Sequence, residues 1–157
     1  MADKALASMN ASILLDEIKT SMSGICQYRP ADSGDKWIFA EIDVLSSQGK
    51  FIGTIDFLGT DTATTTSDKV RWLAVKNLST VSTDGICIDT AGGTPAYDLV
   101  NGIFIGAGEM IVIKCPNTTM GTLHARSVTM DGTYGYPSEA HTGTVKCHVA
   151  AIIDDVA

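Results

Sequence analysis

The sequence predicts an all-β protein: an antiparallel β-sandwich or jelly-roll-like domain preceded by an N-terminal arm or short helix. Short apolar runs follow one another between Val70 and Cys115, and each is bounded by Gly, Asn, Asp, Ser or Pro. Apolar and polar residues alternate over 37–45 and 50–58, which is the period of a half-buried strand. Charged residues make up only 18 % of the chain, below the roughly 25 % of typical soluble domains, and a Thr-rich surface of this kind suits β-structure.

The first 24 residues are compatible with two structures. Apolar residues alternate there as in a strand, at Met9, Ala11, Ile13 and Leu15. The spacing of Leu6, Met9 and Ile13 also fits a helix face, and a short helix over 14–19 is the alternative to a strand or arm. Polar residues interrupt the segment too often for a signal peptide. We therefore divide the chain into an arm or first strand over 1–24 and a single β-sandwich domain over 25–157.

The next two segments predict a hairpin. Residues 37–45 (WIFAEIDVL) and 50–58 (KFIGTIDFL) flank the loop SSQG, and we expect them to pair with each other. One face of the first segment is apolar throughout, with Ile38, Ala40, Ile42 and Val44. Its other face is mixed, with Trp37, Phe39, Glu41 and Asp43. A strand with one core face and one mixed face is typical of an antiparallel sandwich.

The rest of the chain continues the β pattern. Further strands are expected within 70–79, 85–89, 97–100, 102–106, 108–116, 122–130 and 142–155. The turn IGAGE at 105–109 uses two glycines to reverse the chain. A polar loop over 60–67 and an aromatic loop over 131–143 separate the strands. Eight or nine short strands at this spacing indicate one sandwich or jelly-roll domain.

Charge and hydropathy argue against two classes of partner. The formal net charge is −7, and the 11 Lys and Arg residues are scattered singly. A surface that neutralises phosphates needs clustered basic residues, so we expect no nucleic-acid partner. No apolar run approaches the roughly 20 residues of a membrane-spanning helix, so we expect no membrane partner.

The cysteines and histidines do not predict a reaction. Cys147 and His148 are adjacent in an expected strand, where neighbouring side chains point to opposite faces, so they cannot form a dyad. The four cysteines show no C-x-x-C spacing and the three histidines show no H-x-H spacing, so we expect neither zinc nor another metal. The cysteines are interpreted as small buried apolar side chains.

The carboxylates do not predict a reaction either. Glu41, Asp43 and Asp56 superficially resemble the acidic pair of a glycosidase sandwich, but we interpret them as the solvent side of a half-buried sheet. Calcium sites at 61–68 or 32–35 are weak hypotheses because neither loop has the EF-hand ligand pattern. We therefore predict a non-enzymatic protein with no cofactor and no small-molecule substrate.

Three stretches carry a resemblance to a known family: LAVKNLST, DGICIDT and GAGEMIVIKCP. Their order over 70–116 resembles small all-β virion structural proteins of tailed bacteriophages, of the capsid decoration or cement type. In those proteins a strand ending in KN-L/T-S/T leads through a Gly-containing strand to a turn of the type pGE and an apolar strand ending near Pro. The resemblance covers roughly a third of the chain, and Ala107 stands where proline is common in the turn.

The resemblance implies a capsid decoration (cement) protein or a tail or neck component, and we favour the decoration protein of the phage head. Such a protein is made in the host cytoplasm and binds the outer capsid surface of the virion, where it stabilises capsomers of the major capsid protein. Its implied partners are the major capsid protein and copies of itself in a homotrimer, and it implies no catalytic residue. The contact residues that we expect are Tyr134 and Tyr136 in the late loop, with Met9, Ile13 and Leu14 in the arm.

Other functional classes stay open. One is a tail or neck component, or a carbohydrate-binding (receptor-binding) module that stacks sugars on Trp37, Trp72 or the loop tyrosines. Another is an enzyme on a jelly roll, which would need two or three acidic or His groups converging in one pocket.

Overall fold

The fold is described here from a computed structural model, which defines residues 5–15, 18–29, 36–47, 49–52, 65–92, 102–115, 117–131, 137–140 and 143–154. Within these residues every regular element is a β-strand, and all the strand pairs are antiparallel. The predicted all-β class is therefore confirmed. The described part of the chain contains no helix long and apolar enough to cross a membrane.

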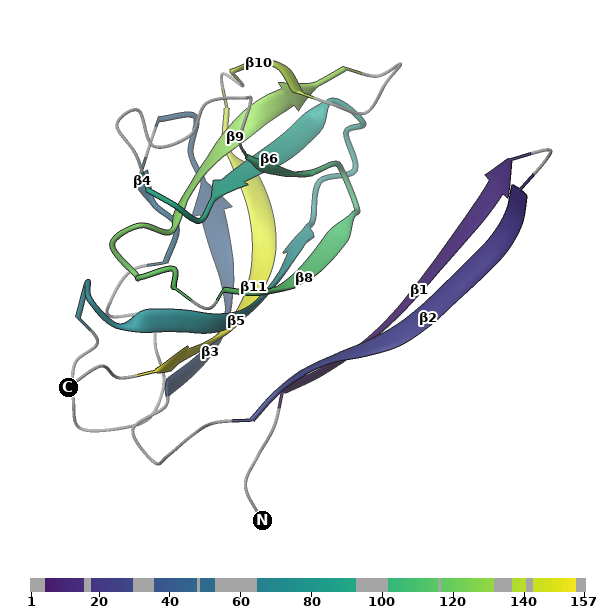
Figure 1. The fold of residues 1–157 in the computed structure, drawn as a ribbon. Helices are drawn as coiled ribbons and strands as arrows, with labels where there is room; N and C mark the ends of the chain where they lie inside the picture. Colours follow the sequence, from purple (N-terminus) through teal and green to yellow (C-terminus); the bar gives the residue numbers. More distant parts are fainter. Residues whose placement is uncertain are drawn as a thin grey trace.

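Eleven strands make up the described fold (Figure 1). They are β1 (Ala5–Leu15), β2 (Ile18–Tyr28), β3 (Lys36–Val44), β4 (Gly49–Lys50), β5 (Lys69–Asn77), β6 (Asp84–Asp89), β7 (Ile103–Ile105), β8 (Met110–Lys114), β9 (His124–Met130), β10 (Pro137–Ala140) and β11 (Val145–Asp154).

Two sheets form the sandwich. The four-stranded sheet has the order β3-β11-β5-β8, and the five-stranded sheet has the order β10-β9-β6-β7 with β4 also paired to β9. The C-terminal strand β11 lies at the centre of the four-stranded sheet, where Val149 is paired with Ala40 of β3 on one side and with Val75 of β5 on the other. The chain passes repeatedly from one sheet to the other, so most neighbours in sequence are not neighbours in a sheet.

An apolar core fills the space between the two sheets. The predicted inner face of β3 contributes to it, with Ile38 and Val44 buried and Ala40 and Ile42 packed against it. Alternate residues of β11 (Val145, Cys147, Val149, Ala151 and Ile153) are buried in the same core. This two-residue repeat of buried positions is what a strand with one covered face produces.

A buried polar residue ties the two sheets together at one corner. Asn77, the last residue of β5, is fully buried. Its side-chain amide donates to the carbonyl oxygens of Asp84 at 3.0 Å and Ile105 at 3.3 Å, and its Oδ1 accepts from the backbone N–H of Ser79 at 2.9 Å. Asn77 therefore links the end of β5 to β6 and β7, which belong to the other sheet.

The GAGE turn leads from β7 to β8 and so connects the two sheets. Gly108 has φ +73°, a conformation that residues with a Cβ rarely adopt. The backbone N–H of Glu109 donates to the carbonyl of Gly106, and the Glu109 carboxylate accepts from the N–H of Gly106 at 2.6 Å. The predicted reversal at this turn is present, but it carries the chain across the sandwich rather than closing a hairpin.

The predicted pairing of 37–45 with 50–58 is wrong where the structure describes it. β3 pairs with β11, and Gly49 and Lys50 pair with β9 in the opposite sheet. Residues 53–58 lie outside the described residues. Phe51 and Ile52 are buried in the sandwich core immediately after β4, so the chain leaves the four-stranded sheet before it could return along β3.

The N-terminal segment forms a long hairpin, not a helix. β1 and β2 pair over their whole length, from Ala5 opposite Tyr28 to Leu15 opposite Ile18. The alternative of a short helix over 14–19 is therefore wrong, since strand residues occupy both sides of the connection at 16–17. β2 continues past residue 24, the predicted boundary between arm and sandwich, and ends at Tyr28. Figure 1 shows this N-terminal hairpin (purple) reaching away from the sandwich as a curved ribbon.

Candidate interaction surface

On β3, β11 and β5 the outer face of the four-stranded sheet is apolar at one end and charged at the other. On β3 the residues that point outward are Trp37, Phe39, Glu41 and Asp43, and all four are exposed. The register of β11 pairs Trp37 with Ile152 and Phe39 with Ala150. Residues paired across an antiparallel sheet lie on the same face, so the apolar end of β3 is continuous with that of β11.

The N-terminal hairpin covers part of this apolar end. Trp72, Ala74 and Ile152 are buried beneath it. The half-buried residues packed around them come from the hairpin and from neighbouring strands: Ala5, Ala7, Cys26, Tyr28, Val112 and Ala150. The small side chains of Ala5 and Ala7 allow the hairpin backbone to lie close to the sheet, and Tyr28 adds an aromatic ring. The base of the hairpin is therefore held by apolar packing on β5, β8 and β11.

Both the sheet face and the hairpin continue, with exposed apolar residues, beyond the area where they contact each other. On the sheet, Trp37 is 55 % and Phe39 62 % exposed, although they are neighbours of the covered residues. On the hairpin, Met9 is 45 % and Met22 60 % exposed, although the positions preceding Met9 in its two-residue repeat, Ala5 and Ala7, pack on the sheet. Among the described residues, this contact thus leaves two apolar surfaces open beside it, the aromatic patch (Trp37 and Phe39) and the distal hairpin face (Met9 and Met22).

A groove separates the distal hairpin face from β8. It has a volume of about 650 Å³ and is lined by Ser8, Met9, Met22, Ser23, Gly24, Met110 and Val112. Three of these residues are methionines, whose flexible thioether side chains adapt to apolar partners of irregular shape. The hairpin and the sheet therefore diverge beyond the packed base, and the walls of the opening are mainly apolar.

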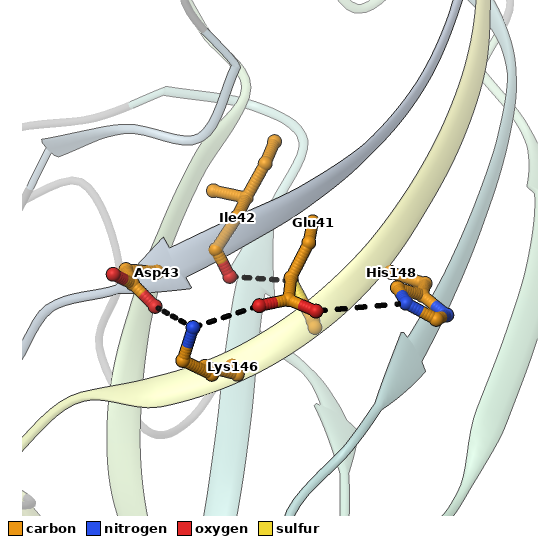
Figure 2. A network of polar contacts seen from close by, with 6 residues as sticks. Glu41, Ile42, Asp43, Lys146 and His148 are labelled. Atoms are coloured by element: carbon orange, nitrogen blue, oxygen red, sulfur yellow. Dashed lines mark hydrogen bonds and ion pairs between the residues drawn. The ribbon is translucent and has the colours of Figure 1, made fainter.

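The charged end of the sheet face holds a small network, shown in Figure 2. The Lys146 ammonium donates to Glu41 Oε1 at 2.7 Å and lies 3.6 Å from Asp43 Oδ1. His148 Nε2 is 3.8 Å from the other Glu41 oxygen, and its ring lies 5.5 Å from that of Phe39. The hydrogen bond with Lys146 lowers the pKa of Glu41, and the same bond together with Asp43 raises the pKa of Lys146. Glu41 and Asp43 are solvent-side groups of the sheet, as expected from the sequence.

The thiols are positioned for packing. Cys147 points into the core while its neighbour His148 lies on the outer face, so the two do not form a dyad. Burial, with a smaller contribution from Asp43 and Glu41, raises the pKa of the Cys147 thiol to about 12, and its Sγ donates to the carbonyl of Ile42 at 3.6 Å. Burial also raises the pKa of Cys115. A thiol kept protonated in this way is a poor nucleophile.

The loops considered for calcium are only partly described. In the first, Asp68 is fully buried and its carboxylate accepts from the backbone N–H and the hydroxyl of Thr65, so it stabilises a turn. Across the described ranges no group of three or more His, Cys, Asp or Glu residues is placed to hold a metal ion. The second loop, 32–35, lies outside the described residues, as does Asp56.

The structure describes some of the predicted contact residues and not others. Met9 lies on the exposed distal hairpin face, opposite Gly24. Ile13 and Leu14 lie in β1, where the register pairs them with Thr20 and Lys19. Leu14 falls out of step with the two-residue repeat of Met9 and Ile13. Tyr134 and Tyr136 lie outside the described residues.

Several exposed apolar residues were not identified as contacts from the sequence. Met22, Ile25, Phe39 and Met110 are each more than half exposed. For Phe39 a signal existed, since WIFAEIDVL places Trp37 and Phe39 on the face opposite the core residues. Trp72, a predicted stacking residue, is only 6 % exposed and lies beneath the hairpin, so it offers no open platform.

Comparison with known proteins adds no family. Neither a scan of the chain against protein-family models nor a search of curated proteins produced a match.

Proposed function

We propose that this chain is a non-enzymatic structural protein that binds other protein subunits through its N-terminal hairpin and the outer face of its four-stranded sheet. The observation that carries the proposal is the exposure of large apolar side chains on both surfaces: Met9 and Met22 on the hairpin, and Trp37 and Phe39 on the sheet. Soluble monomers rarely leave contiguous apolar surface open, and aromatic residues and Met are enriched in interface cores.

Within this class, the function proposed is that of a capsid decoration (cement) protein of a tailed bacteriophage. In this role it binds the outer surface of capsomers of the major capsid protein, assembles with copies of itself as a homotrimer, and resides on the virion. The resemblance of residues 70–116 supports this assignment, and the net charge of −7 favours the outside of the shell over its DNA-facing side. A projecting arm also suits a protein that clamps neighbouring subunits.

The test is binding to capsid shells that lack a decoration protein. The purified chain is mixed with expanded shells and sedimented, and the shells are then heated to find their disruption temperature. We expect the chain to co-sediment at saturating stoichiometry and to raise that temperature. A matched variant lacking residues 1–28 still contains all the strands of the two sandwich sheets, and we expect it to bind at least about tenfold more weakly because it lacks the hairpin anchors. Failure of the chain with its hairpin to bind shells, with binding instead to isolated tails, would contradict the head assignment.

A second candidate function is carbohydrate binding at the aromatic patch. Trp37 is exposed beside Phe39, and the carboxylates of Glu41 and Asp43 follow on the same face of β3. Aromatic rings stack on sugars, and neighbouring carboxylates accept hydrogen bonds from hydroxyl groups. Binding to a glycan array that is lost in Trp37→Ala and kept in Met9→Ala would support this candidate over the first.

A further inference from the structure

The contact between hairpin and sheet within one chain indicates what covers the two surfaces that it leaves open. At the base of the hairpin, Ala7 and Cys26 of one ribbon face pack on Trp72 and Ala74 of the outer sheet face. The distal hairpin face continues the first surface and the aromatic patch continues the second. The distal hairpin face therefore extends a hairpin surface that already packs on a sheet. The aromatic patch extends a sheet surface that already packs on a hairpin.

The two open surfaces cannot meet within one chain. The sheet order β3-β11-β5-β8 places the aromatic patch on one edge strand and Met110 and Val112 on the opposite edge strand. The distal hairpin face lies beside that opposite edge, because Met9 and Met22 line the groove together with Met110 and Val112. Two strands, β11 and β5, therefore separate the aromatic patch on β3 from β8, and the distal hairpin face lies beside β8.

We propose that the distal hairpin face of one chain packs on the aromatic patch of a second copy, continuing the hairpin-on-sheet contact from chain to chain. Met9 and Met22 then contact Trp37 and Phe39, a pairing of thioether and aromatic groups that is favourable in apolar contacts. The strands β1 and β2 contain a single charged residue, Lys19, although the whole chain carries a net charge of −7. A nearly neutral contact surface reduces the repulsion between two acidic copies.

This contact is head-to-tail, because it joins two different surfaces. Each copy offers one hairpin and one patch, so a ring forms if the rotation between copies closes, as in a cyclic trimer. The inference deepens the assembly function proposed above by naming the surfaces through which copies meet. It is tested on the free protein, without capsid shells, so that either proposal can fail while the other stands.

The experiment uses cysteine pairs placed in separate chains. Met22→Cys is made in one chain and Phe39→Cys in another, both with Cys26→Ala to remove the half-buried native thiol; the other three cysteines are buried. The two chains are mixed at equal concentration, oxidised mildly and digested for mass spectrometry. We expect a disulfide between positions 22 and 39, which is necessarily intermolecular. In the matched control, Val81→Cys replaces Phe39→Cys, because Val81 is similarly exposed but lies in the turn between β5 and β6.

Light scattering supplies the second measurement. We expect the unmodified chain to be oligomeric and Phe39→Ser to weaken the association at least about tenfold, with an unchanged circular dichroism spectrum because the side chain is exposed. Val81→Ser serves as the control and is expected to leave the mass unchanged. An oligomer that forms no 22–39 disulfide, or forms mainly 22–22 disulfides, would overturn the head-to-tail contact. A chain that stays monomeric while its Trp37 binds glycans would overturn it as well.

Discussion

The N-terminal hairpin and the sandwich are built from the same alternating pattern, yet they use it differently. In β11 the apolar residues of one face all enter the core between two sheets. In β1, Ala5 and Ala7 meet the outer face of the sheet, whereas Met9, the next residue of the same face, is left 45 % exposed. The pattern predicts which residues share a face, whereas only the tertiary arrangement determines whether a second surface covers that face.

The largest difference between the two regions is expected when one leucine in each is truncated to alanine. Leu73 is fully buried in the sandwich core, and Leu6 is 52 % exposed on the hairpin. We expect Leu73→Ala to reduce the free energy of unfolding by about 3 kcal/mol because it leaves a cavity. Leu6→Ala should change it by less than about 0.5 kcal/mol. Urea denaturation of both variants measures the difference, and equal losses would show that the hairpin is as integral to the fold as the core.

A smaller loss is expected at the corner that joins the two sheets. Asn77→Ala removes the donors to the carbonyls of Asp84 and Ile105 in a buried site. We expect the free energy of unfolding to fall by about 2 kcal/mol, because these groups lose their partner away from water. Ser79→Ala is the control and should cost about 1 kcal/mol or less, since its hydroxyl bonds with Asp84 and Val81 lie nearer the surface. If Asn77→Ala leaves the free energy of unfolding unchanged, the hydrogen bonds of Asn77 between the two sheets do not stabilise the fold.

Thiol chemistry can sharpen the comparison without changing stability. Cys26 lies half-buried at the base of the hairpin, whereas Cys87, Cys115 and Cys147 are buried in the sandwich. We expect one thiol per folded chain to react with a disulfide reagent at pH 8, and none in the variant Cys26→Ala. The rate for Cys26 then reports how accessible the base of the hairpin is in the folded chain. Fast reaction of two or more thiols would mean that the sandwich opens as readily as the hairpin contact.

The pKa of Cys147 adds a pH dependence to this comparison. Its pKa is raised to about 12 in the folded chain, above the ordinary value of 9.0. The folded state therefore holds this proton more tightly than the unfolded state. The linked stability is fully present below pH 9 and is lost as the pH rises from there through about 12.

The smallest effect is expected in the exposed charge network. Lys146→Gln removes the partner that lowers the pKa of Glu41, so we expect the Glu41 pKa to rise toward 4.5. The stability linked to this carboxylate is present above pH 4.5 and is lost as the pH falls through the lower, folded-state pKa. Carboxyl titration by NMR measures the pKa. We expect no change in the melting temperature at 0.5 M salt, since exposed ion pairs are screened.

Local patterns were sufficient to predict the β class and the side-chain faces. Ile38 and Val44 point inward and Trp37 and Phe39 outward, as the alternation in WIFAEIDVL indicates, because that alternation depends only on strand geometry. The early segment was ambiguous because Met9 and Ile13 fit both a strand and a helix. Its pairing resolves the ambiguity, since every residue of β1 has a partner in β2 that lies within twenty-three residues of it, from Leu15 opposite Ile18 to Ala5 opposite Tyr28.

Strand pairing in the sandwich could not be predicted in the same way. The sequence places 37–45 and 50–58 next to a loop suited to a hairpin, yet β3 pairs with β11, which lies more than a hundred residues later. Nothing in a local window specifies a partner at that distance. The candidate surface was found only in part for the same reason, since the exposure of Met22 and Phe39 depends on how far the hairpin extends over the sheet.

The central position of β11 has a consequence for the synthesis of this protein. Because β11 alone connects β3 to β5, the four-stranded sheet cannot form until residues 145–154 have left the ribosome. The N-terminal hairpin can close much earlier, since all its pairs are local. Throughout elongation the nascent chain therefore exposes the apolar faces of β3 and β5, a state prone to aggregation, and the sandwich is completed in one late and slow step.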